Sequence, residues 1–234
     1  MSNIPYEIEH APSYATLILQ LKTGKTAIVE AGAMAAMDTS ITMKSKMRGG
    51  LGKSLMRGVL GGESLFLSEF TAEGKPGQLY LSPGVPGDIK HYSVAPGRGL
   101  VIQSSGFIAS ENTVDLDTKW QGLQRGFFSG ESFFLLHATG QGDVWFSSYG
   151  AILEVPVSGN YIVDNGYIVA FEDSLTYNVE VMGGLSFKGL KTAVLGGEGI
   201  VTRFQGEGKV WIQSRRVFSL INFLNAFRPV KSSD

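Results

Sequence analysis

Short apolar runs with polar residues at alternating positions recur along most of the chain, and glycines separate one run from the next. Val114 and Leu116 show the spacing in one run, and Leu175, Tyr177 and Val179 show it in another. Alternation places successive side chains on opposite faces of a strand, and glycine supplies the positive φ that tight turns need. The pattern predicts an all-β protein with many turns.

One pattern of residues occurs three times. A Gly-Glu pair stands near the start of an apolar segment in each copy, and the first glycines are 68 and then 67 residues apart. A regular spacing of this length indicates a repeated structural unit. The pairs are Gly62 and Glu63, Gly130 and Glu131, and Gly197 and Glu198.

The match extends to both sides of each Gly-Glu pair. Downstream, a glycine turn leads into a strand with an aromatic residue at the same place: Tyr80, Trp145 or Trp211. Glycines at 140–142 and 206–208 predict hairpins there. Upstream, we expect one alternating strand after a glycine in each of the segments 31–43, 105–117 and 165–179.

The repeat predicts three tandem β-sandwich units, because both faces of the aromatic strands carry apolar residues. We place the units at residues 1–84, 85–151 and 152–234. The C-terminal segment departs from the strand period, since Leu220, Leu224 and Phe227 have helical spacing. It predicts a short amphipathic helix over residues 217–227, too short for the ~20 residues of a membrane span.

The repeat resembles the altered-inheritance-of-mitochondria family over nearly the whole chain. The resemblance rests on the threefold GGE…G-x-G-x-V-W pattern, the Gly-rich connections and the closing SRR-V-x-x-L helix. It implies three domains similar to the tryptophan RNA-binding attenuation protein, each a small double-stranded β-helix-like sandwich. Three such domains per chain imply a homotrimer that closes a ring of nine domains. The resemblance implies no agreed enzymatic activity, and the family's fungal member is associated with mitochondrial inner-membrane organisation.

Composition narrows the function classes. The chain of 234 residues is 43% hydrophobic and has no cysteine, so a real core is expected and thiolate metal sites and disulfides are excluded. A net charge of −1 gives no overall attraction for nucleic acid, and the RNA-binding relative's repeated basic residues are missing, since Lys75, Gln141 and Glu207 occupy the corresponding turn positions. The N-terminus lacks a secretory layout, so we expect a cytoplasmic protein.

Candidate catalytic and metal-binding residues are weakly supported. Gly52-Lys53-Ser54 ends like a phosphate-binding loop, but Met47 stands where the first glycine is required. The repeated glutamates favour a structural role, because no partner recurs at a fixed offset. His10, His91 and His137 lack the spacing of metal ligands. We expect no enzyme activity, no cofactor and no metal.

Two further features concern partners. The aromatic residues Tyr80, Trp145 and Trp211 could stack on bases, although packing within the fold is favoured. Residues 39–62 hold five cations and no acid between apolar residues, which suits an anionic membrane surface or an acidic partner; a solvated loop or subunit contact is the favoured alternative. The five cations are Lys44, Lys46, Arg48, Lys53 and Arg57.

Three functional hypotheses follow from these features. The leading one is a non-catalytic, homo-oligomeric β scaffold, with a trimer favoured, that presents loops to a protein partner. The second is binding of RNA or a small ligand at the seams between domains, by analogy with the tryptophan-responsive ring. The third is a protein that attaches to the periphery of a membrane through the basic segment or the terminal helix.

Overall fold

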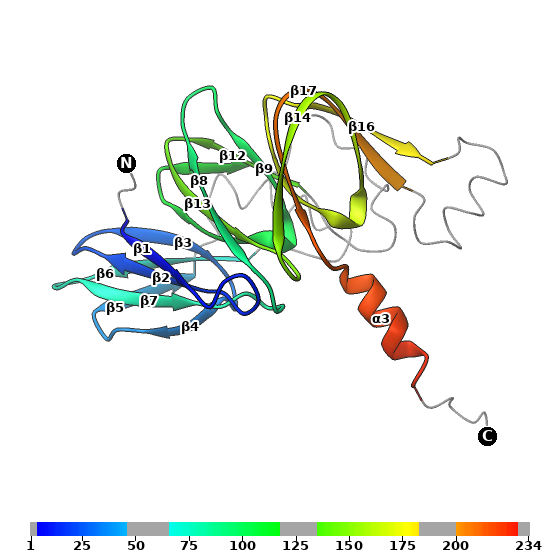
Figure 1. The fold of residues 1–234 in the computed structure, drawn as a ribbon. Coiled ribbons are helices and arrows are strands. Elements are labelled where there is room, and N and C mark those ends of the chain that lie inside the picture. Colours follow the sequence, from blue (N-terminus) through cyan, green and yellow to red (C-terminus); the bar gives the residue numbers. More distant parts are fainter. Residues whose placement is uncertain (1–3, 46–65, 118–134, 183–199, 229–234) are drawn as a thin grey trace.

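The computed structural model describes residues 4–45, 66–117, 135–182 and 200–228. Antiparallel strands make up almost all of this part of the chain, and a single α-helix, α3 (Val217–Asn225), follows the last strand (Figure 1). The all-β fold class is confirmed, and the terminal helix begins where its apolar spacing predicts. The number of tandem repeats and the boundaries at residues 84 and 151 stay predictions.

The strands form three sheets. The first sheet has the order β1 (Tyr6–Glu9), β2 (Thr16–Leu21), β7 (Gly77–Leu81), β4 (Met34–Met37). The second has the order β5 (Ile41–Ser45), β6 (Leu67–Ala72), β3 (Thr26–Glu30), β10 (Phe107–Glu111), β13 (Gly142–Ser147), β8 (Ile89–Val94). The third has the order β11 (Val114–Asp117), β12 (Leu135–Gly140), β9 (Leu100–Gln103), β15 (Ile168–Glu172), β17 (Ile200–Gln213), β14 (Ile152–Asp164), and β16 (Thr176–Val181) also pairs with β17.

The same local pairing occurs in all three sheets. In each, a short strand pairs with the aromatic strand, the register shifts by one residue, and an alanine then lies opposite the aromatic residue. A β-bulge of this kind bends and twists the strand. The alanine suits the position because its small side chain leaves room beside the ring. The three pairs are Ala36 and Tyr80, Ala109 and Trp145, and Ala170 and Trp211.

Strands from different predicted units share a sheet. Strand β3 pairs with β10, where Val29 lies opposite Ala109. Strand β9 pairs with β15 in the same register, where Ile102 lies opposite Ala170. Each predicted unit therefore contributes a strand edge that the following unit extends, so the units are joined by backbone hydrogen bonds as well as by side-chain packing.

The hairpins predicted at the glycine turns are wrong. Strand β12 belongs to the third sheet and β13 to the second, so the chain crosses between sheets at Gly140–Gly142 instead of turning back on itself. The corresponding glycines at 206–208 lie inside β17, one strand of 14 residues. Gly140 and Gly206 have φ of 93° and 117°, which lets the chain bend sharply while its two halves join different neighbours.

The single strand expected upstream of each Gly-Glu pair is also wrong, because each of these segments contains two strands. Strands β4 and β5 come from the first segment, β10 and β11 from the second, and β15 and β16 from the third. The connections are short polar stretches at residues 38–40, 112–113 and 173–175. Asp, Asn, Ser and Thr favour such turns because their side chains bond to nearby backbone groups. Strand β10 is buried at every position, so it lacks the alternation expected of it.

The core consists of three clusters of buried hydrophobic residues, and the first cluster lies between the first and second sheets. Trp145 is fully buried in the first cluster, Trp211 is almost fully buried in the second, and Phe204 is fully buried in the third. The first cluster joins residues from the first predicted unit with Ile108, Ala109 and Trp145 of the second. The seams between the predicted units are therefore part of the core.

A glycine at the first seam provides a test of this arrangement. Gly87 forms a parallel bridge with Gly150, and a Cβ at Gly87 would overlap the carbonyl oxygen of Ser148. We expect Gly87→Ala to lower the free energy of unfolding by about 2 kcal/mol or more, because backbone must move. Gly84→Ala is the matched control, since its Cβ would meet open space; we expect a change within about 1 kcal/mol. Urea unfolding of both variants checks the difference, and equal stabilities would contradict it.

Candidate functional site

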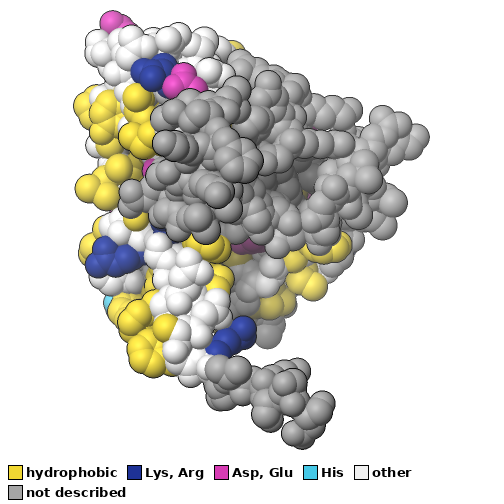
Figure 2. Space-filling view, turned by 90° about the vertical axis from the view of Figure 1, so that its right-hand side faces the viewer, with side chains coloured by type: hydrophobic (Ala, Val, Ile, Leu, Met, Phe, Trp, Pro, Cys, Tyr) yellow, Lys and Arg dark blue, Asp and Glu magenta, His cyan; other side chains and the backbone are white. Residues whose placement is uncertain are grey.

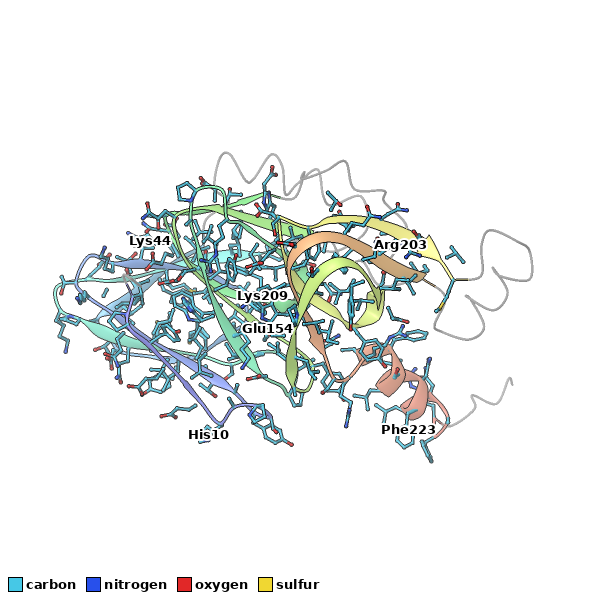
Figure 3. All side chains as sticks on the ribbon, turned by 45° about the horizontal axis from the view of Figure 1, so that its top comes forward. His10, Lys44, Glu154, Arg203, Lys209 and Phe223 are labelled. Atoms are coloured by element: carbon cyan, nitrogen blue, oxygen red, sulfur yellow. The ribbon has the colours of Figure 1, made fainter. Side chains whose placement is uncertain are left out.

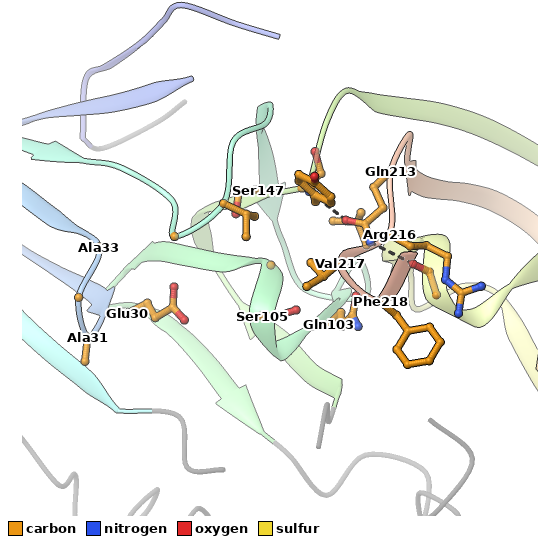
Figure 4. Close-up of a pocket in the computed structure, with 18 residues that line it drawn as sticks. Glu30, Ala31, Ala33, Gln103, Ser105, Ser147, Gln213, Arg216, Val217 and Phe218 are labelled. Atoms are coloured by element: carbon orange, nitrogen blue, oxygen red, sulfur yellow. Dashed lines mark hydrogen bonds between the residues drawn. The ribbon is translucent and has the colours of Figure 1, made fainter. Parts of the chain in front are cut away.

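A pocket of about 440 Å³ opens where turns from the three predicted units come together (Figure 4). The pocket is lined by the turns that follow β3, β9 and β14, by the end of β13, and by the residues between β17 and the start of α3. The volume lies within the range of small-molecule sites, roughly 300–1,000 Å³.

Glu30 supplies the pocket's acid. It is the last residue of β3, and its carboxylate points toward the side of the pocket that holds Ser105 and Ser147 (Figure 4). Burial raises the pKa of Glu30 to about 7. Within the described ranges, no ion pair with Glu30 offsets that burial. The carboxyl group is therefore poised to gain or lose a proton near neutral pH.

Arg216 supplies the pocket's fixed positive charge. Its Nη1 lies 3.6 Å from Oδ2 of Asp164, and its guanidinium carbon lies 5.6 Å from the centre of the Tyr167 ring. Gln213 lies beside it and donates from Nε2 to the carbonyl oxygen of Gly166 at 3.0 Å. These contacts hold the arginine against the turn after β14. The pocket thus combines a carboxyl group, a guanidinium group and neutral hydroxyl groups.

Among the described residues, Ser93, His91 and Asp143 lie together outside the pocket but do not form a hydrolytic arrangement. The Ser93 hydroxyl donates to Oδ1 of Asp143 at 2.8 Å, and Nε2 of His91 lies 2.6 Å from the same oxygen. Serine and histidine both contact the carboxylate, so the imidazole is not placed as a base for the hydroxyl. The described residues also contain no group of three or more His, Asp or Glu side chains arranged to hold a metal ion.

Two sheet edges form a second feature of functional interest. Strand β4 ends the first sheet, and the C-terminal half of β14 pairs with β17 on one side only. Apolar side chains on both segments are exposed to solvent: Met37 is 39% exposed and Ile162 is 44% exposed. We call these two segments, Met34–Met37 and Tyr161–Asp164, the open edges.

Equivalent positions elsewhere in the chain are buried. By its place opposite the aromatic strand, Met37 corresponds to Ser110, which is fully buried, and to Phe171, which is 2% exposed. Ile162 lies opposite Arg203, as Ile28 lies opposite Glu69 and Val101 opposite His137. It therefore corresponds to Ile28 and Val101, whose exposures are 5% and 0%. The open edges are therefore the two halves of a pairing that the chain makes twice internally.

Most of the predicted site residues lie outside the described part of the chain. These are Lys46, Arg48, Lys53, Arg57, Gly62, Glu63, Gly130, Glu131, Gly197 and Glu198. Lys44 is described: it is exposed on β5, and its Nζ lies 3.8 Å from Oε1 of Glu73 (Figure 3). The basic segment's role stays a prediction.

The aromatic residues of the repeat occupy different environments. Trp145 lies within 5.4 Å of the Tyr6 ring centre, and Trp211 donates from Nε1 to Oε2 of Glu154 at 3.2 Å. Both indoles are buried, which leaves no ring face for a base. Tyr80 is half-buried, and its hydroxyl donates to Oε1 of Gln78 at 3.1 Å.

Sequence reasoning missed Glu30, Arg216 and the open edges. Glu30 and Arg216 stand outside the repeated motif, so nothing in the spacing marks them. Met37 and Ile162 fit the apolar pattern of an ordinary strand. Alignment of the three copies could have found the open edges, because the first and last units of a tandem array each lack one neighbour.

Comparisons with known proteins agree with the fold. A crystal structure of protein SPYM3_0169 from Streptococcus pyogenes is similar over 97% of this chain and 100% of that chain, with a TM-score of 0.78 and 22% sequence identity. The uncharacterized protein M6_Spy0233 of Streptococcus pyogenes serotype M6 is 24% identical over 236 residues, which are 97% of this chain and 92% of the relative. The family model of Mitochondrial biogenesis AIM24 matches residues 6–215.

The raised pKa of Glu30 predicts a pH dependence of stability. Burial disfavours the carboxylate in the folded state, so the stability associated with the protonated group is lost as pH rises from about 4.5 to about 7. Glu30→Gln removes this loss. We expect the variant to be more stable than the parent by about 1–2 kcal/mol at pH 8, after allowance for solvent screening, and equal to it near pH 4. Chemical unfolding at both pH values measures this, and a constant difference would contradict it.

Proposed function

The chain belongs to the Mitochondrial biogenesis AIM24 family, and from this membership we propose that it is a non-catalytic scaffold that assembles head to tail with copies of itself. The open edges support the assembly. The lack of a nucleophile with a base among the described residues supports a binding role over a catalytic one. The relative M6_Spy0233 is itself named uncharacterized, so the comparison suggests no reaction.

The unmatched pairing carries the proposal. Strand β4 of one copy would pair with the end of β14 of the next, in the register that β10 makes with β3 and β15 makes with β9. Ala36 would then lie opposite Val163, and Met37 opposite Ile162. This contact is heterologous, because each copy offers a different surface on each side, and such contacts form rings when the rotation closes.

The energetics favour a paired state. An unpaired sheet edge leaves backbone N–H and C=O groups available to another chain. The side chains at the open edges include Met34, Met37, Tyr161 and Ile162, each between 37% and 44% exposed. Burying a fully exposed side chain of this size contributes about 1.5–3 kcal/mol. Because less than half of each side chain is still exposed, each would add about 1 kcal/mol, and the four together support a contact.

The proposed assembly is a homotrimer in the cytoplasm. Three predicted units per chain and three chains would give the ring of nine units that the resemblance implies. None of the helices in the described residues has the length and apolar character needed to cross a membrane. The membrane alternative rests on the basic segment and the terminal helix, and Lys44 is the one of the segment's five cations that lies in the described ranges.

A second candidate function is binding of a small ligand, favoured by the pocket at the seams. A partly buried carboxylate without an ion-pair partner among the described residues would favour an ammonium group, so primary amines are the chemistry to test first. Binding of RNA has less support, because Trp145 and Trp211 are buried.

Calorimetric titration with putrescine and spermidine tests the amine site. We expect binding to strengthen as pH rises from 5 to 8, because Glu30 loses its proton over this range. Glu30→Gln should abolish the heat of binding. Glu7→Gln is the matched control, since Glu7 is an exposed glutamate on β1 that does not line the pocket. Equal binding by the parent and Glu30→Gln would reject the site.

Light scattering after size exclusion tests the assembly. We expect the parent to have about three times the 25.2 kDa chain mass at micromolar concentration. Met37→Lys and Ile162→Lys should each give the mass of one chain, because a lysine charge would be buried in the contact. Leu153→Lys is the control, since Leu153 is also on β14 and 49% exposed but lies outside the open edges. A monomeric parent would overturn the proposal.

Mixing the two edge variants tests the head-to-tail geometry. Met37→Lys retains a working β14 edge and Ile162→Lys retains a working β4 edge, so an equimolar mixture should form a dimer of one chain of each kind. A contact between two β4 edges would instead tolerate Ile162→Lys, and the mixture would then contain Ile162→Lys homodimers but no dimer of one chain of each kind. Either of those results would reject the proposed pairing.

A further inference from the structure

Most of helix α3 lies away from the strands of its own chain. At its start, Val217 and Phe218 line the pocket. The rest of the helix extends away from the strands (Figure 1), Phe223 lies on it well clear of the sheets (Figure 3), and hydrophobic side chains are exposed at the lower end of the molecule (Figure 2). None of its residues is buried. An isolated helix of nine residues has little stability in water, so its persistence calls for a partner. The exposed side chains on it and just after it are Phe218, Leu220, Ile221, Phe223, Leu224 and Phe227.

The chemistry of α3 favours a protein partner over a lipid surface. Leu220, Phe223 and Leu224 share one face with Phe227, while Ser219, Asn222 and Asn225 occupy the other. No charged residue occurs from Val217 to Phe227. Helices that lie on membranes usually carry lysine or arginine along the polar face, whereas a small neutral face suits a protein contact.

The helix starts at one of the open edges. Arg216, the residue before α3, pairs with Asp164, which is the last residue of β14. It also lies over the Tyr167 ring in the turn that follows β14. The direction of α3 is thereby fixed next to the strand end that would receive the next copy.

Backbone hydrogen bonds at the two internal seams show which groups lie at the position from which α3 starts. At successive seams, Ala15 N–H donates to Gly87 C=O at 2.9 Å, and Asp88 N–H donates to Gly150 C=O at 3.0 Å. Each bond joins the residue before one strand, β2 or β8, to a residue before the corresponding strand of the next unit, β8 or β14. The series ends with Ala151 N–H, which donates to Oγ of Ser214 at 2.9 Å. The Ser214 hydroxyl therefore takes the acceptor position that a following unit fills at the two internal seams, and α3 begins three residues later.

We propose that the apolar face of α3 packs on the next copy of the chain, beside the residues that precede its β2, as a second part of the contact made by the open edges. This inference rests on the proposed assembly. The receiving segment includes Tyr14, whose side chain is 73% exposed in a single chain. One subunit contact would thus bury both the open edges and the helix.

Thiol protection tests the proposal, and the absence of cysteine from the chain makes the test clean. Leu224→Cys introduces a single thiol on the apolar face. In the assembled protein we expect it to react with an aromatic disulfide reagent at least about tenfold more slowly than in the Leu224→Cys, Ile162→Lys monomer, because reaction needs a solvent-exposed thiolate. Asn222→Cys on the neutral face is the control and should react equally fast in both backgrounds.

The outcomes separate this inference from the assembly itself. An assembled Leu224→Cys variant whose thiol reacts as fast as it does in the monomer would reject the helix contact and leave the edge pairing intact. A parent that stays monomeric would reject both. Protection that develops only when phosphatidylglycerol vesicles are added would assign α3 to a lipid surface and overturn the proposal. Phe227→Cys, at a position 72% exposed, provides a second variant for the same measurement.

Discussion

Backbone N–H and C=O groups at a strand edge need hydrogen-bond partners, and the arrangement of the sheets depends on which strand supplies them. Strand β3 is completed by β10, and β9 by β15, so each predicted unit passes an edge to its successor. Hydrogen bonds along these edges place the units in register, and the core clusters then form across the seams. The last unit has an edge and no successor within the chain, which leaves β14 open, and the first unit has no predecessor within the chain, which leaves β4 open.

Two local devices make the shared sheets possible. Glycines with positive φ, such as Gly140 and Gly206, let a chain leave one sheet and enter another within a few residues. A bulge beside Ala36, Ala109 or Ala170 then twists the short strand. One side of this strand pairs with the aromatic strand, and the other side is left to pair with a strand of the preceding unit. The alanine and the aromatic residue are complementary in size, which explains why both recur while neighbouring residues vary.

Sequence patterns could predict the all-β class and the terminal helix, because these follow from short-range periodicity. The number of repeats stays a prediction. The patterns could not predict which strands pair. Gly140–Gly142 and Gly206–Gly208 satisfy the residue requirements of a hairpin, and only tertiary pairing distinguishes a hairpin from a crossing between sheets. The site was harder still. Glu30 reaches its pocket through turns more than 70 residues away in the chain, and Ile162 differs from Val101 only in lacking a neighbour.

The continuity of the backbone makes the seams unequal. In the proposed ring, two of the three seams per chain would be tethered by the backbone, so dilution would leave them closed. The third would depend on encounter between separate molecules and would therefore respond to the amount of protein that a cell makes. A ring built in this way would open at its intermolecular joints before any other, and abundance itself would act as the control on assembly.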